Sequence, residues 1–225
     1  MIGIFDSGVG GICAYNTVRR ALVREDIIYL ADRKNAPYGT KTEDEILNFT
    51  KNNIRTLKSM GAELILIACC SASTVYRRLN EEERAISIPI ISPAAREAAE
   101  VGGKIAVIAT KHTVRSGTFS REIARFSDTT VCEMAEQELV SLVEGGNRDG
   151  RVNEECKCYL ADMAKRIKLT EANTLILGCT HFSHLECEIG ALLPEVKIIS
   201  PARVGAEEMI KKIKKCRENG KIIYM

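Results

Sequence analysis

Two short apolar runs, each ending in a cysteine, constrain the fold more than any other feature of this chain. They are Leu64-Ile65-Leu66-Ile67-Ala68-Cys69 and Thr174-Leu175-Ile176-Leu177-Gly178-Cys179. Each run is too short for a helix, is rich in Ile and Leu, and stops at small polar residues, which is typical of a strand buried on both faces of a parallel sheet. Because α/β folds build their sites at the carboxyl ends of such strands, an internal duplication would place one thiol on either side of a shared cleft.

Apolar runs alternate with amphipathic segments along the whole chain, and this rhythm predicts an α/β fold built from βαβ units. We expect strands at 2–5, 27–30, 64–68, 88–91, 105–108, 175–177 and 196–199, and helices at 12–24, 41–60, 73–79, 116–126, 136–144, 153–167 and 204–218. Several of these helices follow Ser, Thr or Asn, which cap helix starts.

No linker rich in Pro, Gly or Ser divides the chain, so the domain boundary is expected from the repeat. Gly3-Ile4-Phe5-Asp6-Ser7 has an echo in Ala106-Val107-Ile108-Ala109-Thr110, which favours a boundary near Ser92-Pro93. Because chain ends commonly lie close together, the segment from about Ser200 is expected to return to the first half. The predicted domains are therefore 1–92 with 200–225, and 93–199.

Composition excludes several classes of protein. The net charge of the 225 residues is only +2, which gives no electrostatic reason to expect nucleic acid or an anionic membrane as partner. No apolar run reaches membrane-spanning length and no basic leader precedes the first strand, so we expect a cytoplasmic protein. Nine cysteines, an odd number, favour reduced thiols over a disulfide framework.

A glycine-rich turn follows the first predicted strand, in Asp6-Ser7-Gly8-Val9-Gly10-Gly11. Free backbone N–H groups at a helix start can hold a carboxylate or phosphate. The turn lacks the lysine of a P-loop and the spacing of a dinucleotide fingerprint, so a plain strand-to-helix turn is the alternative. Asp6 favours a site that also meets an ammonium group. Pro37-Tyr38-Gly39, taken alone, predicts only another turn.

The segments Cys69-Cys70-Ser71-Ala72-Ser73 and Cys179-Thr180-His181-Phe182-Ser183 combine a thiol, a hydroxyl and a helix start. A helix N-terminus lowers the pKa of a cysteine and makes the thiolate available as a base or nucleophile. One alternative is a pair of buried structural cysteines. Another is a zinc site, for which the candidate ligands are Cys179, His181, His184 and Cys187. A single helix cannot easily turn all four around one tetrahedral ion, so we predict no metal.

Taken together, five motifs occur in the order and spacing of glutamate racemases, in the cofactor-independent aspartate/glutamate racemase superfamily. The motifs are Asp6-Ser7-Gly8-Val9-Gly10-Gly11, Pro37-Tyr38-Gly39, Ala68-Cys69, Leu142-Val143-Glu144 and Leu177-Gly178-Cys179-Thr180-His181. The resemblance implies two pseudosymmetric α/β domains, each a mostly parallel sheet flanked by helices, with the active site in the cleft between them. It also implies that the protein interconverts L- and D-glutamate without a cofactor, supplies D-glutamate for peptidoglycan, and forms a homodimer.

By the same resemblance, Cys69 and Cys179 are the two catalytic bases, one for each face of the substrate's Cα. Asp6 would assist Cys69, and His181 would assist Cys179, with Glu144 near the second pair. The substrate's amino and carboxylate groups would be held by Asp6, Ser7, Tyr38, Gly39, Cys70, Ser71, Thr180 and His181.

Three departures from the family pattern concern the surroundings of the two bases. Cys70-Ser71 replaces the usual Asn-Thr, Ala135-Glu136-Gln137 replaces Ala-Cys-Pro, and Phe182-Ser183 replaces Tyr-Pro. Losing a hydrogen-bonding amide can change specificity by orders of magnitude. Aspartate or another amino acid as the substrate, and a non-catalytic amino-acid-binding protein, therefore remain as alternatives.

Overall fold

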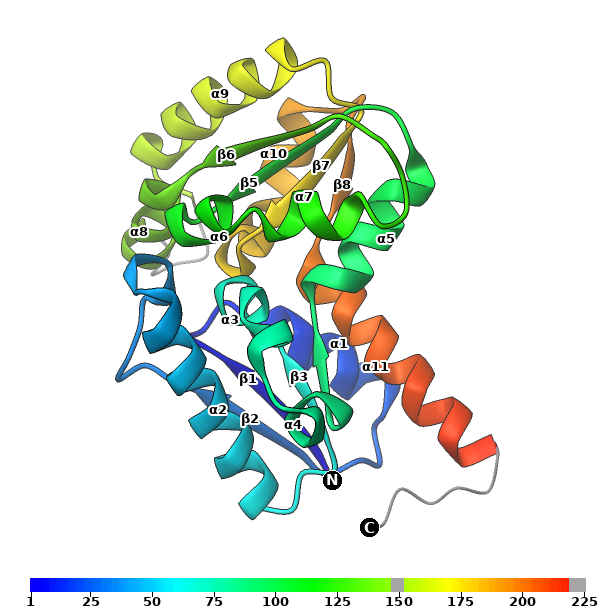
Figure 1. The fold of residues 1–225 in the computed structure, drawn as a ribbon. Coiled ribbons are helices and arrows are strands. Elements are labelled where there is room, and N and C mark those ends of the chain that lie inside the picture. Colours follow the sequence, from blue (N-terminus) through cyan, green and yellow to red (C-terminus); the bar gives the residue numbers. More distant parts are fainter. Residues whose placement is uncertain (147–151, 219–225) are drawn as a thin grey trace.

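The computed structural model describes residues 1–146 and 152–218, and within them two parallel four-stranded sheets form the framework (Figure 1). The first sheet has the order β2-β1-β3-β4, with β1 at Ile2–Asp6, β2 at Ile27–Ala31, β3 at Leu64–Ile67 and β4 at Ser87–Pro89. The second has the order β6-β5-β7-β8, with β5 at Ile105–Ala109, β6 at Val131–Ala135, β7 at Thr174–Gly178 and β8 at Lys197–Ile199. The predicted fold class is confirmed.

The two sheets repeat one topology, so each strand of the first has a counterpart in the second. Strand β1 pairs with β2 and β3, and β5 pairs in the same way with β6 and β7. All four central strands, β1, β3, β5 and β7, are buried along their whole length, because helices cover both faces of each sheet. Cys69 and Cys179 follow the equivalent strands β3 and β7.

Helices and short 3-10 turns connect the strands. In the first half they are α1 (Ile12–Ala21), η1 (Tyr38–Thr40), α2 (Glu43–Ser59), α3 (Cys70–Thr74), η2 (Tyr76–Arg78) and α4 (Glu81–Ala85). After β4 come α5 (Ile91–Val101), α6 (Lys111–Ser116), α7 (Thr118–Ile123), α8 (Gln137–Gly146), α9 (Glu154–Leu169), η3 (Thr180–Leu185), α10 (Glu186–Leu192) and α11 (Pro201–Glu218). Helix α2 starts at a capping box in which the side chains of Thr42 and Glu45 each bond the other's backbone N–H.

Alternation along the central strands divides the buried side chains into three clusters. Ile65 and Ile67 pack with α2 on the outer face of the first sheet. Leu175 and Leu177 pack with α9 and α10 on the outer face of the second. Side chains of the opposite parity, such as Leu66, Val107 and Ile176, belong to one cluster shared with α1, α5 and α11. This shared cluster joins the two halves through apolar contacts.

Helix α11 packs along α1 and α5 and also contacts β3 and β4 (Figure 1). The last described helix therefore packs against the first helix. The predicted boundary near Ser92-Pro93 falls in the first turn of α5, and α5 itself contacts α7 and β7 of the second half.

Polar contacts also join the halves. Glu122 of α7 is buried and accepts hydrogen bonds from Arg77 of η2 at 2.6 and 3.0 Å and from the Ser92 hydroxyl at 2.9 Å. Burial alone would raise the pKa of this carboxyl, but the bonds from Arg77, Arg125 and Ser92 outweigh it and lower the pKa. The Thr74 hydroxyl meets Nε2 of His112 at 2.9 Å.

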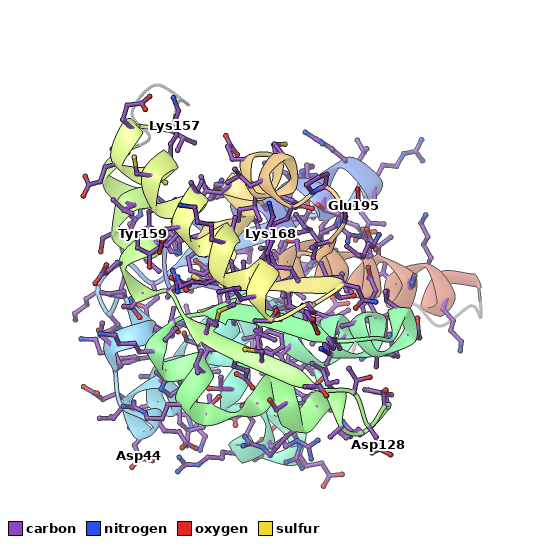
Figure 2. The ribbon with its side chains drawn as sticks, turned by 90° about the horizontal axis from the view of Figure 1, so that it is seen from above. Asp44, Asp128, Lys157, Tyr159, Lys168 and Glu195 are labelled. Carbon is purple, nitrogen blue, oxygen red and sulfur yellow. The ribbon has the colours of Figure 1, made fainter. Side chains whose placement is uncertain are left out.

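The outer surface is strongly charged, as Figure 2 shows for Asp44, Lys157, Lys168 and Glu195. Tyr159 projects from the same helix, α9, as the two lysines but is only partly exposed. Among residues 1–146 and 152–218, no helix is long and apolar enough to cross a membrane.

Some predicted elements were wrong in detail. The helix expected at 73–79 is instead α3 followed by η2, because the Ser73 hydroxyl donates to the Ile67 carbonyl and accepts from the Ile90 N–H, and such side-chain bonds compete with a continuing helix. The strand expected at 88–91 ends at Pro89, and Ile91 already begins α5. Strand β6 was missed, because this edge strand is only partly buried and its sequence has no apolar run.

We expect Gly178→Ala to lower the free energy of unfolding by about 1–3 kcal/mol, the usual cost of overpacking a core. A Cβ at Gly178 would lie 2.9 Å from the Ile108 carbonyl oxygen and 3.0 Å from the Phe119 ring. Urea denaturation followed by circular dichroism measures the change.

The matched control is Gly190→Ala in α10, where the nearest atom to a new Cβ is Ile198 Cδ1 at 3.6 Å. The same substitution should there raise the free energy of unfolding by about 0.5–1 kcal/mol, because alanine favours a helix interior over glycine. Equal shifts in the two variants would contradict the packing described at β7.

Candidate active site

The carboxyl ends of the central strands of both sheets meet around one cavity. Asp6 ends β1, and Cys69 follows β3, while Thr110 and Cys179 directly follow β5 and β7. Nine of the residues singled out in the sequence line this cavity: Ser7, Tyr38, Gly39, Cys69, Cys70, Ser71, Cys179, Thr180 and His181. Asp6 and Glu144 stand behind this lining.

Cys69 occupies the N-cap position of α3, with only 4% of its surface exposed. Its thiol donates to the Ser7 hydroxyl oxygen over 3.5 Å. Burial, and next the negative charge of Asp6, raises the pKa of the Cys69 thiol to about 12. At neutral pH this cysteine is therefore a neutral thiol.

Cys179 begins a chain of polar contacts that leads out of the cavity. Its sulfur lies 3.7 Å from Nδ1 of His181, and Nε2 of His181 lies 2.9 Å from Oε1 of Glu144. The thiol and the imidazole are buried, whereas the Glu144 side chain, from α8, is 50% exposed. An imidazole held by a carboxylate can accept the thiol proton at Nδ1, so this arrangement can move a proton away from Cys179.

The expectation that helix starts lower both thiol pKa values is wrong for this structure. Burial raises the pKa of the Cys179 thiol as well, and it outweighs the backbone N–H groups of His181 and Phe182, which favour the thiolate. At Cys69 the N–H groups of Ala72 and Ser7 have the same favourable but smaller effect. The donors are present as the sequence predicted, but exclusion of water dominates.

Asp6 is fully buried and connects the two halves at the back of the cavity. Its Oδ2 accepts from the Gly8 N–H at 2.8 Å, and its Oδ1 accepts from the Thr180 hydroxyl at 3.1 Å. Burial raises the pKa of this carboxyl, and His181 opposes the shift by its positive charge when protonated. Asp6 in turn raises the pKa of both Cys69 and Cys179, so its electrostatic effect reaches both thiols.

The Tyr38 hydroxyl is bound on the side of the first half. It donates to Oδ2 of Asp32 at 2.5 Å and accepts from the Asn53 amide at 3.0 Å. The ring is buried, and burial followed by the bond to Asp32 raises the pKa of Tyr38. Tyr38 therefore offers the cavity its ring and backbone, while its hydroxyl fixes the turn that carries Gly39.

Gly39 and Ser71, both from the first half, lie directly against Thr110 of the second half. A Cβ on Gly39 would lie 2.7 Å from Cβ of Thr110, so only glycine fits. The Ser71 hydroxyl shares hydrogen bonds with the hydroxyls of Thr110 at 3.2 Å and Thr113 at 3.3 Å. These hydroxyls bond one another across the cleft.

Sequence reasoning left four lining residues out of the predicted site: Pro37, Thr110, Gln137 and Val140. Thr110 could have been found from the repeat. In the second half it corresponds to Ser7, which follows β1 in the first half. Gln137 was visible only as a departure from a family pattern. The residues that line this cavity include no lysine or arginine.

Among the described residues, no group of three His, Cys, Asp or Glu side chains is placed to hold a metal ion. The zinc alternative required Cys179, His181, His184 and Cys187 to converge, and they do not do so. His181 contacts Cys179 and Glu144, and Cys187 is exposed.

Comparison with known proteins gives one consistent result. The model of the Asp/Glu/hydantoin racemase family matches residues 14–209. A glutamate racemase from Gloeobacter violaceus is 35% identical over 213 residues, which are 93% of this chain and 79% of that protein.

Solved structures agree with the sequence matches. A glutamate racemase isoform from Bacillus anthracis superposes with a TM-score of 0.83 at 31% identity, over 99% of this chain and 83% of its own. A glutamate racemase from Francisella tularensis in complex with D-glutamate superposes with a TM-score of 0.86 at 26% identity, over 100% of this chain and 83% of its own. The resemblance inferred from the motifs is confirmed, and the chain belongs to the Asp/Glu/hydantoin racemase family.

Proposed function

We propose that this protein interconverts L- and D-glutamate without a cofactor, through two cysteines that act as opposed bases. The observation that carries the proposal is the pair of buried thiols, Cys69 and Cys179, that reach one cavity from equivalent strands of two repeated sheets. The relatives named as glutamate racemases support glutamate as the substrate. A base on each face of the Cα allows a proton to leave from one side and arrive from the other.

In one direction of the reaction, His181 accepts the Cys179 thiol proton at Nδ1, and Glu144 holds the opposite edge of the ring. The Cys179 thiolate then removes the α-proton, while the neutral thiol of Cys69 donates its proton to the other face. The reverse direction starts from the Cys69 thiolate. Both sulfurs are buried, and poor solvation strengthens the basicity of whichever sulfur is ionised.

The same residues suit a zwitterionic amino acid. The substrate's ammonium group lies near the carboxylate of Asp6, which has neutral hydrogen-bond donors in Gly8 and Thr180 but faces no lysine or arginine in the lining of the cavity. The hydroxyls of Ser7, Ser71 and Thr180 and the close backbone at Tyr38 and Gly39 supply neutral groups for binding, and the Cys70 thiol lines the same cavity. These assignments are part of the proposal.

We also propose the predicted domain organisation, 1–92 with 200–225 and 93–199. Its support is that β1 to β4 lie in the first set and β5 to β8 in the second, and that α11 packs on α1.

A role in supplying D-glutamate for peptidoglycan follows from the proposed activity. A cytoplasmic location is supported by the eight described cysteines, all of them free. Homodimerisation stays a prediction of the family resemblance.

The direct test is exchange of the α-proton in deuterated water, followed by NMR, with L- and D-glutamate and L- and D-aspartate offered separately and no cofactor added. We expect exchange and racemisation of glutamate. Activity on aspartate alone would move the substrate assignment to the residues around Cys70, and binding of glutamate without exchange would indicate a non-catalytic protein.

Replacing either proposed base should separate racemisation from exchange. We expect Cys69→Ser and Cys179→Ser each to lower the kcat of racemisation by about 10²–10⁴-fold, the usual contribution of a general acid or base. Each variant should keep slow α-proton exchange on one enantiomer, and the two variants should differ in which one.

Cys158→Ser, at an exposed position on α9, is the control for loss of a thiol as such. It should racemise at the wild-type rate. Full racemase activity in either the Cys69 or the Cys179 variant would exclude the two-base mechanism.

Buried neutral thiols also make stability depend on pH. Burial raises the pKa of Cys69, Cys70 and Cys179 in the folded state. In the unfolded chain a thiol ionises above about pH 8.5, so the unfolded state loses protons first and stability falls as pH rises. For each buried thiol, the linkage between protonation and folding lowers the free energy of unfolding by about 2 kcal/mol between about pH 8 and pH 10.

We therefore expect Cys70→Ala to flatten this decline by about 1–2 kcal/mol. Urea denaturation at the two pH values, compared with Cys158→Ala, measures the difference. A decline as steep as that of the wild type would mean that Cys70 ionises equally well in the folded protein.

A further inference from the structure

One residue of the cavity, Gln137, has no part in the proposed proton transfer. It is the first residue of α8 and the only carboxamide among the residues that line the cavity. Its Oε1 accepts a hydrogen bond from the Lys111 N–H at 3.3 Å. The same oxygen would lie 2.9 Å from a Cβ on Gly39, so the side chain reaches across from the second half to the first.

The start of α8 is held rigidly, which gives Gln137 a fixed position. The preceding residue, Glu136, is buried and accepts from the Tyr159 hydroxyl at 2.5 Å and from Arg166 at 2.7 and 3.2 Å. Its backbone N–H donates to the Ala109 carbonyl at 2.8 Å, which ties α8 to the end of β5. A polar group on such a support is positioned before a ligand arrives.

The hydrogen bonds of the Gln137 amide leave its donors free. Because Oε1 is occupied by Lys111, the two N–H groups of Nε2 face away from that bond, and no acceptor for them is found among the described residues. No lysine or arginine lines the cavity, and the hydroxyls of Ser71 and Thr110 already bond to each other. Nε2 is therefore a free, preformed donor for a carboxylate.

We propose that Gln137 binds the side-chain carboxylate of the substrate and so selects dicarboxylic amino acids; this inference rests on the proposed racemase function. The contacts of Gln137, to Lys111 and against Gly39, are separate from those around the reacting atoms. Asp6, Ser7, Thr180 and His181 surround the two thiols, where the Cα and its ammonium must lie. The far end of the substrate is the part left for Gln137.

The test replaces one donor group by an acceptor of the same shape. Gln137→Glu keeps an oxygen for the Lys111 N–H but sets a carboxylate against the substrate's carboxylate, and an acidic residue in the first turn of a helix does not disturb folding. We expect kcat/KM for glutamate to fall by about 30–100-fold, chiefly through KM, because a lost charged hydrogen bond and a like-charge contact are combined.

The second substrate is glutamine, whose terminal amide can donate to the new carboxylate. Gln137→Glu should therefore shift the ratio of kcat/KM for glutamate to that for glutamine by about 100-fold towards glutamine. Gln137→Ala should lower kcat/KM for glutamate by about 10-fold, with kcat changed less than about 3-fold. Glu138→Gln, the converse substitution at the next, exposed position of α8, is the matched control and should leave the ratio unchanged.

Calorimetric affinities for glutamate and glutamine, measured on the wild type and Gln137→Glu, separate this inference from the proposed function. Wild-type racemisation of glutamate with an unchanged substrate ratio in Gln137→Glu would overturn the role of Gln137 and leave the function standing. A wild type without turnover, in which the variant still shifts the affinity ratio, would overturn the function and support the role of Gln137. Absence of a shift in both turnover and affinity would overturn that role.

Discussion

The structure depends on the contact between the carboxyl-terminal ends of the strands of the two sheets. Each half buries its central strands under helices, so the carboxyl ends of β1, β3, β5 and β7 are where polar groups of the two halves can approach one another. Bonds such as that from the Thr180 hydroxyl to Asp6 and those between Ser71 and Thr110 close this junction. The polar side chains buried at this junction are poorly solvated, and the protonation states of the site follow from that poor solvation.

Loss of water decides the resting protonation of the site. Backbone N–H groups point at both sulfurs, yet burial raises the pKa of each thiol. A site of this kind keeps both thiols neutral until a ligand arrives, and the ammonium group of an amino acid is the positive charge that offsets a thiolate. Substrate binding and activation of the base are thus expected to be coupled.

The two sulfurs have unequal surroundings despite the repeated topology. Cys69 bonds a hydroxyl, Ser7, which can relay a proton but cannot carry a charge, whereas Cys179 contacts an imidazole backed by a half-exposed carboxylate. Asp6 raises the pKa of both. The duplication therefore supplies two similar positions, and the neighbouring side chains make them different. The two directions of the reaction need not have equal rates.

The sequence was most informative where one physical rule acted alone. Runs such as Leu64–Ile67 are apolar on both faces and therefore predicted buried strands, and they located both thiols. It was least informative where tertiary contacts decide. The short helix α3 ends because Ser73 bonds the backbone of β3 and of Ile90, the residue before α5, and β6 pairs with one strand alone, β5. The raised thiol pKa values likewise depend on how the halves close, which no local motif reveals.

A cavity whose described lining holds no lysine or arginine recognises an acid in a particular way. An arginine would attract a carboxylate over a distance and tolerate a shift in its position, whereas a carboxamide acts only within hydrogen-bonding distance and by its orientation. A glutamine side chain differs from a glutamic acid side chain only in its terminal group. Gln137→Glu can therefore invert the preference of this position, from a substrate carboxylate to a substrate amide, without a change of shape. Selectivity that rests on a neutral donor can thus be changed by one substitution, while the thiols and their strands stay as they are.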